Sequence, residues 1–246
     1  MISERSAFVT GAAQGLGRSI AEGLFDAGYR VALTDVSKDV EAVAVAMDPM
    51  GERVLPVQVD VRDEAAFQAA FDKAVAEFGH ISVLINNAAR TVARPLWDIA
   101  IGEWDDVLAV NLRGVFIGSR IAGRHMRERG FGRIINIGSI AGQLASPGSG
   151  AHYAAAKAGV LALTKLFALE LAPAGVTVNA IAPSAIQSPM LNEVSPERLA
   201  GLLASVPSGR FGTPAEVTAA VLYLASDDAG YTTGATIDVN GGRLMR

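Results

Sequence analysis

Two residues four apart, Tyr153 and Lys157, bring proton-transfer chemistry into an otherwise apolar segment, HYAAAKAG at 152–159. Because residues i and i+4 share one face of a helix, we expect the phenol and the ammonium to lie close together. A free tyrosine has a pKa of about 10, and a neighbouring ammonium is expected to lower it. Such a tyrosine can exchange a proton with a substrate hydroxyl. The alternative is an amphipathic pair at a helix edge, with the lysine stem buried and its ammonium in water.

A second group of residues is suited to binding phosphate. The stretch TGAAQGLG at 10–17 places three glycines between a predicted strand and a predicted helix. The first permits a tight turn, the second a close approach of backbone to ligand, and the third close packing of helix on strand. The helix N-terminus then offers free N–H groups to a pyrophosphate. The alternative is a plain strand–turn–helix. We predict a dinucleotide site with loop contacts from Gly11, Gln14, Gly15, Leu16 and Gly17.

Two aspartates at strand ends refine this prediction. Asp35 ends the second predicted strand, 18 residues beyond Gly17. Its carboxylate can accept hydrogen bonds from the adenosine ribose hydroxyls and would repel a 2′-phosphate, so we predict NAD(H) as the cofactor. The alternatives are a capping or turn aspartate here and a phosphate contact from Arg18. Asp60 ends the third strand and is predicted to meet the adenine; the alternative is an N-cap for the helix that starts near Asp63.

Composition limits the classes of protein to consider. The chain has 246 residues, 50% of them hydrophobic, a net charge of −4 and no cysteine. This suits one large globular core, and no basic block indicates a nucleic-acid or membrane partner. Without cysteine there is no disulfide or thiolate metal site, and we predict no metal and a cytoplasmic location. The longest apolar run, 154–172, contains three charged residues and is predicted to be a buried helix and not a membrane span.

The order of elements predicts the fold. Near-continuous apolar strands alternate with helical patterns, which indicates a parallel sheet covered on both faces. We predict a single α/β domain over 1–246 with a doubly wound, seven-stranded parallel sheet. The expected strands are 6–11, 30–35, 54–60, 83–88, 133–139, 177–183 and 236–242. The expected helices are 15–27, 38–47, 63–78, 101–129, 152–172 and 214–225, with a looser lid at about 184–212. In such sheets ligands bind beyond the carboxyl ends of the strands.

In order and placement these motifs resemble the short-chain dehydrogenase/reductase family, which has a single-domain Rossmann fold. The resemblance rests on TGAAQGLG, NNAA at 86–89, Asn111, Ser139 and the pair Tyr153-xxx-Lys157. It covers the whole chain and includes NAIAPSAIQSPM at 179–190 and GYTTGATIDVNGG at 230–242.

The resemblance implies a role for each matching residue. Tyr153 would be the general acid/base, and Lys157 would bind the nicotinamide ribose and lower the tyrosine pKa. Ser139 would hydrogen-bond the substrate oxygen, and Asn111 would hold a water that relays protons from Lys157. Without the resemblance, Ser139 would be a strand-end turn residue and Asn111 a kink within a helix. The cofactor contacts would be completed by Val61, Asn87, Ala88, Lys157, Ile186 and Ser188.

The chain departs from the family pattern beside the cofactor. Ala89 stands where the family usually has glycine, and its methyl group is expected to crowd the ribose side of the cofactor. Ser184 replaces another usual glycine and Ser188 a usual threonine, and Asn240 replaces a common aspartate. These departures affect the expected pocket and leave the catalytic groups in place.

The substrate is expected among 91–96, 140–147, His152 and 184–210, with Ser139, Gln143 and Tyr153 as its predicted contacts. His152 is equally open to interpretation as a surface residue. Other polar candidates in these stretches are Arg90, Arg94, Asn192 and Glu193.

Three functions are weighed. The first is an NAD-dependent dehydrogenase of a secondary alcohol, including polyols and sugar alcohols; the second is a 3-oxoacyl-thioester reductase acting on acyl-carrier-protein or CoA substrates. Family members of the second kind usually prefer NADPH and carry basic residues near the end of the helix 152–172. Asp35 argues against a preference for NADPH, and LAPAG at 171–175 contains no basic residue. The alcohol dehydrogenase is therefore favoured. The basic segment 124–133 favours a carrier-protein partner. The third is a nucleotide-binding sensor without turnover.

The helix 152–172 is apolar nearly all round, which predicts burial on more than one side. We infer that one side packs on the sheet and the other on a second subunit, with close approach at Ala154, Ala155, Ala158, Val160 and Leu161. The family resemblance implies a homotetramer.

Overall fold

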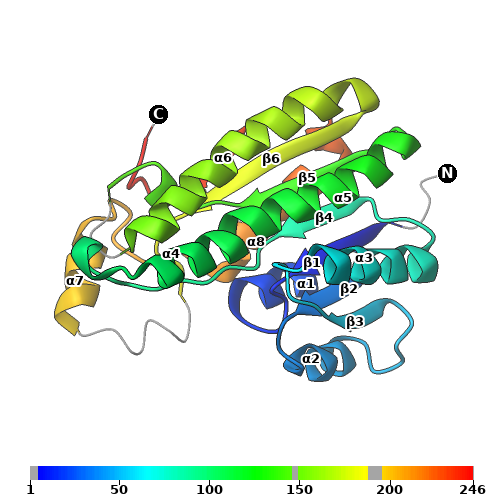
Figure 1. Ribbon diagram of the computed structural model, residues 1–246, viewed down its shortest axis with the longest axis horizontal. Helices are drawn as coiled ribbons and strands as arrows, with labels where there is room; N and C mark the ends of the chain where they lie inside the picture. Colours follow the sequence, from blue (N-terminus) through cyan, green and yellow to red (C-terminus); the bar gives the residue numbers. More distant parts are fainter. Residues whose placement is uncertain (1–4, 146–148, 188–195, 246) are drawn as a thin grey trace.

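The computed structural model describes residues 5–145, 149–187 and 196–245, and within them seven parallel strands form one sheet (Figure 1). Their spatial order is β3-β2-β1-β4-β5-β6-β7. The predicted doubly wound α/β domain with a seven-stranded parallel sheet is confirmed. The strands are β1 (Ser6–Thr10), β2 (Arg30–Asp35), β3 (Val54–Gln58), β4 (Val83–Asn86), β5 (Gly132–Ile137), β6 (Val176–Pro183) and β7 (Thr236–Val239).

Helices cover both faces of the sheet (Figure 1). Side chains of α1, α2 and α8 pack on one face, and side chains of α3, α5 and α6 pack on the other. The α-helices are α1 (Gly15–Asp26), α2 (Asp39–Met47), α3 (Glu64–Phe78), α4 (Ile101–Leu108), α5 (Gly114–Arg129), α6 (Ala151–Leu171), α7 (Pro196–Ala204) and α8 (Pro214–Ala225). Short 3-10 turns are η1 (Leu96–Asp98), η3 (Ile140–Gly142), η4 (Ala172–Ala174) and η6 (Asp227–Ala229).

The central strands are apolar without alternation because both of their faces are buried. In β1, Val9 points into the core beneath α1 and α8, while Phe8 points into the opposite core and packs on Phe67 and Phe71. Burying an apolar side chain of this size contributes about 1.5–3 kcal/mol. The apolar residues whose pattern predicted a sheet buried on both faces therefore also contribute much of the free energy that stabilises it.

The predicted helix 101–129 is interrupted. Residues Ala109–Arg113 form a π-helical turn, η2, between α4 and α5. Asn111 lies inside this turn, as the kink interpretation predicted, and its side chain is fully buried. A π turn adds a residue to the helical ladder and is frequent at functional sites. It turns the Asn111 side chain inward, against the chain that follows β4.

The predicted lid at 184–212 is only partly described. It contains α7, which the sequence analysis did not predict, and a single parallel bridge joins Ile186 to Gly212. Residues 188–195 lie outside the described part of the chain, and with them Ser188, Asn192 and Glu193.

The strand order reverses between β1 and β4, and connections leave this point towards opposite faces. A crevice at the carboxyl ends of the strands is expected where this happens. Within the described ranges no helix combines the length and the apolar character needed to cross a membrane.

Candidate active site

A cleft of about 690 Å³ opens at the carboxyl ends of the central strands. It is lined by residues that the sequence analysis selected from segments far apart in the chain. These are Gly11, Gln14, Gly15, Leu16, Gly17, Asp35, Asp60, Val61, Asn87, Ala88, Ser139, Tyr153, Lys157 and Ile186. The fold thus brings the predicted nucleotide loop and the predicted catalytic pair to one site.

The glycine loop is held against the end of β4. Asn87 Nδ2 donates to the carbonyl oxygens of Thr10, at 2.9 Å, and Gly11, at 3.1 Å. Gly11 has a φ of 67°, and a Cβ there would lie 2.8 Å from Ala88 Cα. A Cβ on Gly17 would collide with the Gly11 carbonyl oxygen. Gly15, at φ 56°, has open space beside it, which leaves room for a ligand against the backbone.

Asp35 lies at the cleft and bonds to two backbone amides. Its Oδ2 accepts from Ala13 N at 3.0 Å, and its Oδ1 accepts from Ser37 N at 2.9 Å. The turn interpretation is therefore correct as a local description, and Asp35 also lines the cleft. Arg18, the candidate for a 2′-phosphate, pairs with Glu22 at 2.8 Å.

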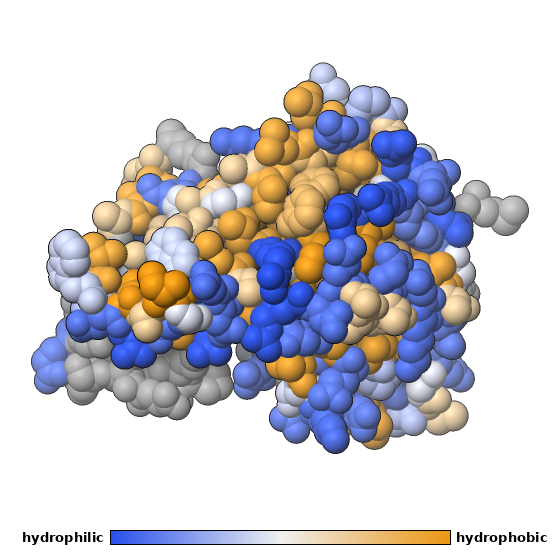
Figure 2. Space-filling view, in the orientation of Figure 1, coloured by the Kyte–Doolittle hydropathy of each residue, from blue (hydrophilic) through white to orange (hydrophobic). Residues whose placement is uncertain are grey.

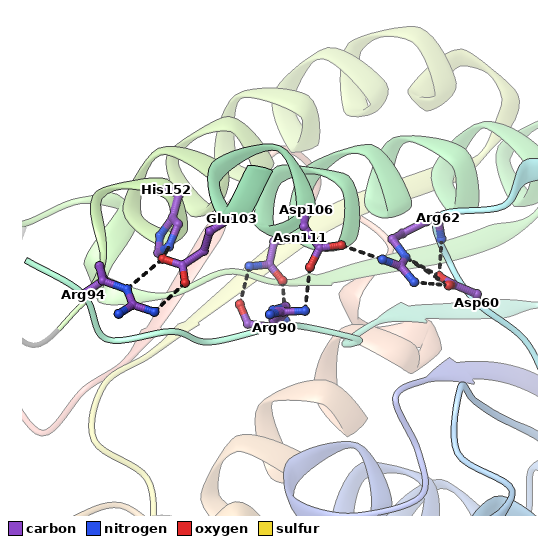
Figure 3. Close-up of polar contacts among 8 residues, drawn as sticks. All are labelled: Asp60, Arg62, Arg90, Arg94, Glu103, Asp106, Asn111 and His152. Carbon is purple, nitrogen blue, oxygen red and sulfur yellow. Dashed lines mark hydrogen bonds and ion pairs between the residues drawn. The ribbon is translucent and has the colours of Figure 1, made fainter. Parts of the chain in front are cut away.

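Asp60 is not the cap of α3. Asp63 caps that helix, since its Oδ1 accepts from Ala66 N at 3.0 Å. The Asp60 carboxylate instead binds the Arg62 guanidinium at 2.6 Å, and this contact lowers the pKa of Asp60 (Figure 3). Both side chains line the cleft beside Val61.

Lys157 is buried, and its side chain points back to the sheet. Its Nζ donates to the Ile137 carbonyl oxygen at 2.6 Å and lies 5.7 Å from the centre of the Tyr153 ring. Burial lowers the pKa of Lys157 to about 8. The amphipathic interpretation, which placed this ammonium in water, is wrong: Lys157 is 2% exposed.

The expected direction of the Tyr153 pKa shift is also corrected. Burial raises the pKa of Tyr153, and hydrogen bonding to the side chains of Ser139 and Thr91 only partly opposes this. Desolvation of the phenolate outweighs these two hydrogen bonds. Tyr153 is therefore protonated at neutral pH in this structure.

Asn111 lies behind the cleft, outside its lining. Its Oδ1 accepts from Arg90 N at 2.7 Å and its Nδ2 donates to Arg90 O at 2.8 Å (Figure 3). This pair of bonds fixes the backbone directly before Thr91, which contacts Tyr153. A water relay at Asn111 stays a prediction; the geometry gives its side chain a positioning role.

Two predicted substrate residues lie elsewhere than expected. Gln143 Nε2 donates to Asp238 Oδ1 at 2.8 Å, and Gln143 is not among the residues that line the cleft. His152 is not on the surface: its side chain is fully buried and lies 3.3 Å from Glu103. The Gln143 side chain is therefore bound to β7, and its contact with substrate stays a prediction.

The departures from the family pattern are accommodated. Among the described residues no non-glycine has a positive φ, so Ala89 needs no glycine conformation, and it lines the cleft. Ser184 also lines the cleft, and its Oγ accepts from Arg243 at 3.3 Å.

Two cleft residues, Arg62 and Asp106, were not predicted from the sequence. Asp106 on α4 bridges two arginines, Arg62 at 2.5 Å and Arg90 at 2.6 Å (Figure 3). With Asp60 these residues form a line of alternating charge along the cleft. The sequence carried one signal for them: Asp106 lies three residues from Glu103, and residues so spaced on a helix share a face.

The residues present fit a dinucleotide. The glycine loop provides a cradle beside Gly15 that side chains leave open. Lys157 is a buried ammonium at the cleft whose one acceptor among the described residues is the Ile137 carbonyl, so donors remain for ribose hydroxyls. A carboxylate, Asp35, lines the same cleft and could accept hydrogen bonds from the hydroxyls of the second ribose.

Comparison with known proteins agrees with this geometry. A family model described as enoyl-(acyl carrier protein) reductase matches residues 11–243. The chain is 42% identical over 239 residues to the 3-oxoacyl-(acyl-carrier-protein) reductase FabG of Escherichia coli K12, covering 97% of each chain. It is 43% identical over 243 residues to FabG of Staphylococcus aureus Mu50, covering 98% of each.

A solved structure leads to the same family. A crystal structure of an Agrobacterium tumefaciens protein, assigned as a gluconate dehydrogenase, superposes with a TM-score of 0.93 at 33% identity, over 98% of this chain and 96% of that one. Fold, cleft and near full-length similarity agree: the chain belongs to the short-chain dehydrogenase/reductase family, whose members are oxidoreductases that use a nicotinamide dinucleotide.

Proposed function

We propose that this enzyme reduces the ketone of a 3-oxoacyl thioester to the 3-hydroxyacyl thioester, with NADH as reductant. The observation that carries the reaction type is the placement of Ser139 and a protonated Tyr153 at the cleft, above a buried Lys157. The substrate class is supported by near full-length relatives named 3-oxoacyl-(acyl-carrier-protein) reductase. These relatives favour the thioester over the polyol that the sequence analysis preferred.

The chain's own groups would act on the ketone oxygen. Tyr153 would donate its phenolic proton to that oxygen, and its raised pKa keeps the proton in place at neutral pH. Ser139 would donate a hydrogen bond to the same oxygen and stabilise the charge that develops there. Lys157 would hold the cofactor ribose with its buried ammonium. The nicotinamide supplies the hydride to the substrate carbon.

The preference for NADH is supported by the charges near Asp35. This carboxylate lines the cleft, and Arg18 is engaged by Glu22. Lys38, the next cation along the chain after Asp35, is exposed and does not line the cleft. A 2′-phosphate would therefore meet a negative charge and gain no cation from these residues.

A second function is favoured by the same carboxylate and by the structural relative. An NAD-dependent dehydrogenase of secondary alcohols, with polyols or polyhydroxy acids as substrates, would use the same residues in the opposite direction. The solved structure assigned as a gluconate dehydrogenase supports this candidate.

Absorbance at the nicotinamide band separates the two functions. Oxidation of NADH with acetoacetyl-CoA would support the thioester reductase, whereas NADH formation from polyols or gluconate alone would support the second candidate. Tyr153→Phe is expected to lower the turnover number (kcat) about 10²–10⁴-fold while NADH binding is retained. Full turnover by this variant would exclude the proposed mechanism.

The cofactor preference has its own test. Asp35→Ser is expected to weaken NADH binding about 10–100-fold and to strengthen NADPH binding, because a charged hydrogen-bond acceptor and its repulsion are removed. Fluorescence titration with each cofactor measures both changes. Asp26→Ser, an exposed carboxylate at the end of α1, is the control. An unchanged NADH affinity in the Asp35 variant would contradict the role given to this residue.

Self-association also stays a proposal. Apolar side chains gather over α5 and α6 (Figure 2), and Phe116, Leu166 and Leu169 are 40%, 60% and 76% exposed. These exposed residues support packing against a second copy. Val160, one of the predicted contact residues, is fully buried within its own chain and cannot contribute.

A further inference from the structure

His152 makes two contacts at the start of the catalytic helix α6. Its Nδ1 accepts a hydrogen bond from Tyr153 N at 2.9 Å, and its Nε2 lies 3.3 Å from Glu103 Oε1 (Figure 3). The imidazole is fully buried. His152 therefore lies between the backbone of the catalytic tyrosine and a carboxylate on α4.

The bond to Tyr153 N replaces a missing helix cap. The first N–H groups of a helix lack partners within the helix, and a side chain at the N-cap normally supplies one. Here the N-cap is Gly150, which has no side chain and makes no such bond. His152 Nδ1 takes over this task for the N–H of Tyr153.

These two contacts fix the tautomer of the imidazole. Nδ1 can accept from Tyr153 N only when it carries no proton, so the proton of the neutral ring is on Nε2. From there it points to Glu103, whose carboxylate can only accept. The opposite tautomer would place two N–H groups against each other at Tyr153 and break the cap.

The imidazole is held in place from three sides. Glu103 is itself bound by Arg94, with contacts of 2.7 and 3.1 Å, and this pairing lowers the pKa of Glu103 and keeps it ionised. The ring lies over Gly150, where a Cβ would collide with it. Arg94 belongs to the segment that begins at Thr91, so the same contacts tie that segment to α6.

From this geometry we infer that His152 is a positioning residue of the reaction: its unprotonated Nδ1, held by Glu103, sets the start of α6 and thereby the position of Tyr153. The inference rests on the proposed catalytic role of Tyr153. The hydroxyl that must meet the substrate belongs to the residue whose N–H is capped. A misplacement of about 1 Å at a reacting group can cost on the order of 10²-fold in rate.

Two substitutions separate the contacts of His152. In His152→Asn the amide oxygen occupies the place of Nδ1 and can still accept from Tyr153 N, but the link to Glu103 is lost. In His152→Gln the amide reaches the place of Nε2 and can still donate to Glu103, but the cap is lost. The variants have similar polarity and delete opposite halves of the arrangement.

The expected result is an effect on kcat alone. His152→Gln should lower kcat about 10–100-fold, with the Michaelis constant (KM) for acetoacetyl-CoA and the dissociation constant (Kd) for NADH unchanged within about threefold. His152→Asn should keep kcat within about threefold of the native enzyme. If the role of His152 were purely structural, substitution would change the melting temperature (Tm), and His152→Gln and His152→Asn would have similar kcat values.

Several outcomes would overturn the inference. These are full kcat in both variants, or a loss in His152→Asn as large as in His152→Gln. If His152→Gln does not fold, His152→Ala takes its place, because it also removes the acceptor for Tyr153 N, with Lys165→Ala as an exposed control on the same helix. A kcat for His152→Ala within about threefold of that of His152→Asn would then overturn the inference. Tyr153→Phe is measured alongside: if that variant keeps full turnover, the proposed function fails, whereas an inactive Tyr153→Phe with a fully active His152→Gln refutes the inference alone.

Discussion

The two ends of the cleft are built in different ways. The nucleotide end consists mainly of backbone: a glycine loop, a helix N-terminus and one carboxylate, Asp35, which binds backbone amides. At the catalytic end the decisive contacts are between side chains. Glu103 and Asp106 on α4 bind Arg94 and Arg90 of the chain that follows β4, and Glu103 also meets His152 on α6.

The difference teaches where each end is vulnerable. The glycine loop is disrupted when a side-chain atom is added to it, because its closely packed backbone atoms have no room to move. A side-chain network fails when a partner is removed, and its exposed ion pairs contribute little to stability by themselves. We therefore expect changes at the nucleotide end to affect folding and cofactor binding, and changes at the catalytic end to affect turnover.

The largest effect on stability is expected at Gly17. In Gly17→Ala the new Cβ would collide with the Gly11 carbonyl oxygen, which is backbone and cannot rotate away. We expect a loss of about 3 kcal/mol in the free energy of unfolding, together with loss of NADH binding. Gly15→Ala is the matched comparison: its Cβ meets open space, so only its positive φ is strained, at about 1 kcal/mol. Urea denaturation measures both, and equal losses would contradict the steric account.

A smaller effect of opposite sign is expected at Lys157. Burial lowers the pKa of this lysine from 10.5 to about 8 in the folded protein, so at neutral pH the fold carries a buried charge. Lys157→Met should raise the free energy of unfolding of the cofactor-free protein at pH 7 by about 1–3 kcal/mol while abolishing turnover. The exposed Lys165 on the same helix gives the control, Lys165→Met.

The same lysine predicts a pH dependence. Between about pH 8 and 10 the unfolded chain keeps the Lys157 proton that the folded chain has lost, so this group makes stability rise with pH. Denaturation curves at pH 7 and 10 should show that contribution in the native protein and not in Lys157→Met. An equal pH response in the two proteins would contradict it.

The smallest effect on the folded chain is expected at Leu169. This residue is 76% exposed on α6, so Leu169→Lys should change the stability of a single chain by less than about 0.5 kcal/mol. It should nevertheless weaken the proposed self-association and shift sedimentation to smaller species than those of the native protein. Val45→Lys, at a 66% exposed position on α2, should leave the assembly unchanged. A native protein that sediments as a monomer at micromolar concentration would refute self-association.

The sequence by itself determined the layers of the fold and most of the residues around the cleft. The apolar strands could only be buried between helices, and parallel strands place their carboxyl ends at one edge. Gly11, Asp35 and Ser139 were therefore predicted to gather at that edge, although up to 128 positions separate them. These predictions rest on local spacing and on the geometry common to all such sheets, whereas the place of Tyr153 beside Ser139 was implied by the family resemblance.

Only the tertiary structure decided the electrostatics of the site. Burial raises the pKa of Tyr153, and hydrogen bonds to the side chains of Ser139 and Thr91 only partly oppose this; spacing along a helix gives neither the burial nor these partners. The side-chain partners of Asp106 and His152 lie on other elements, so no local pattern connects them. Burial and long-range pairing arise when separate segments pack together, and a pattern along the chain does not contain them.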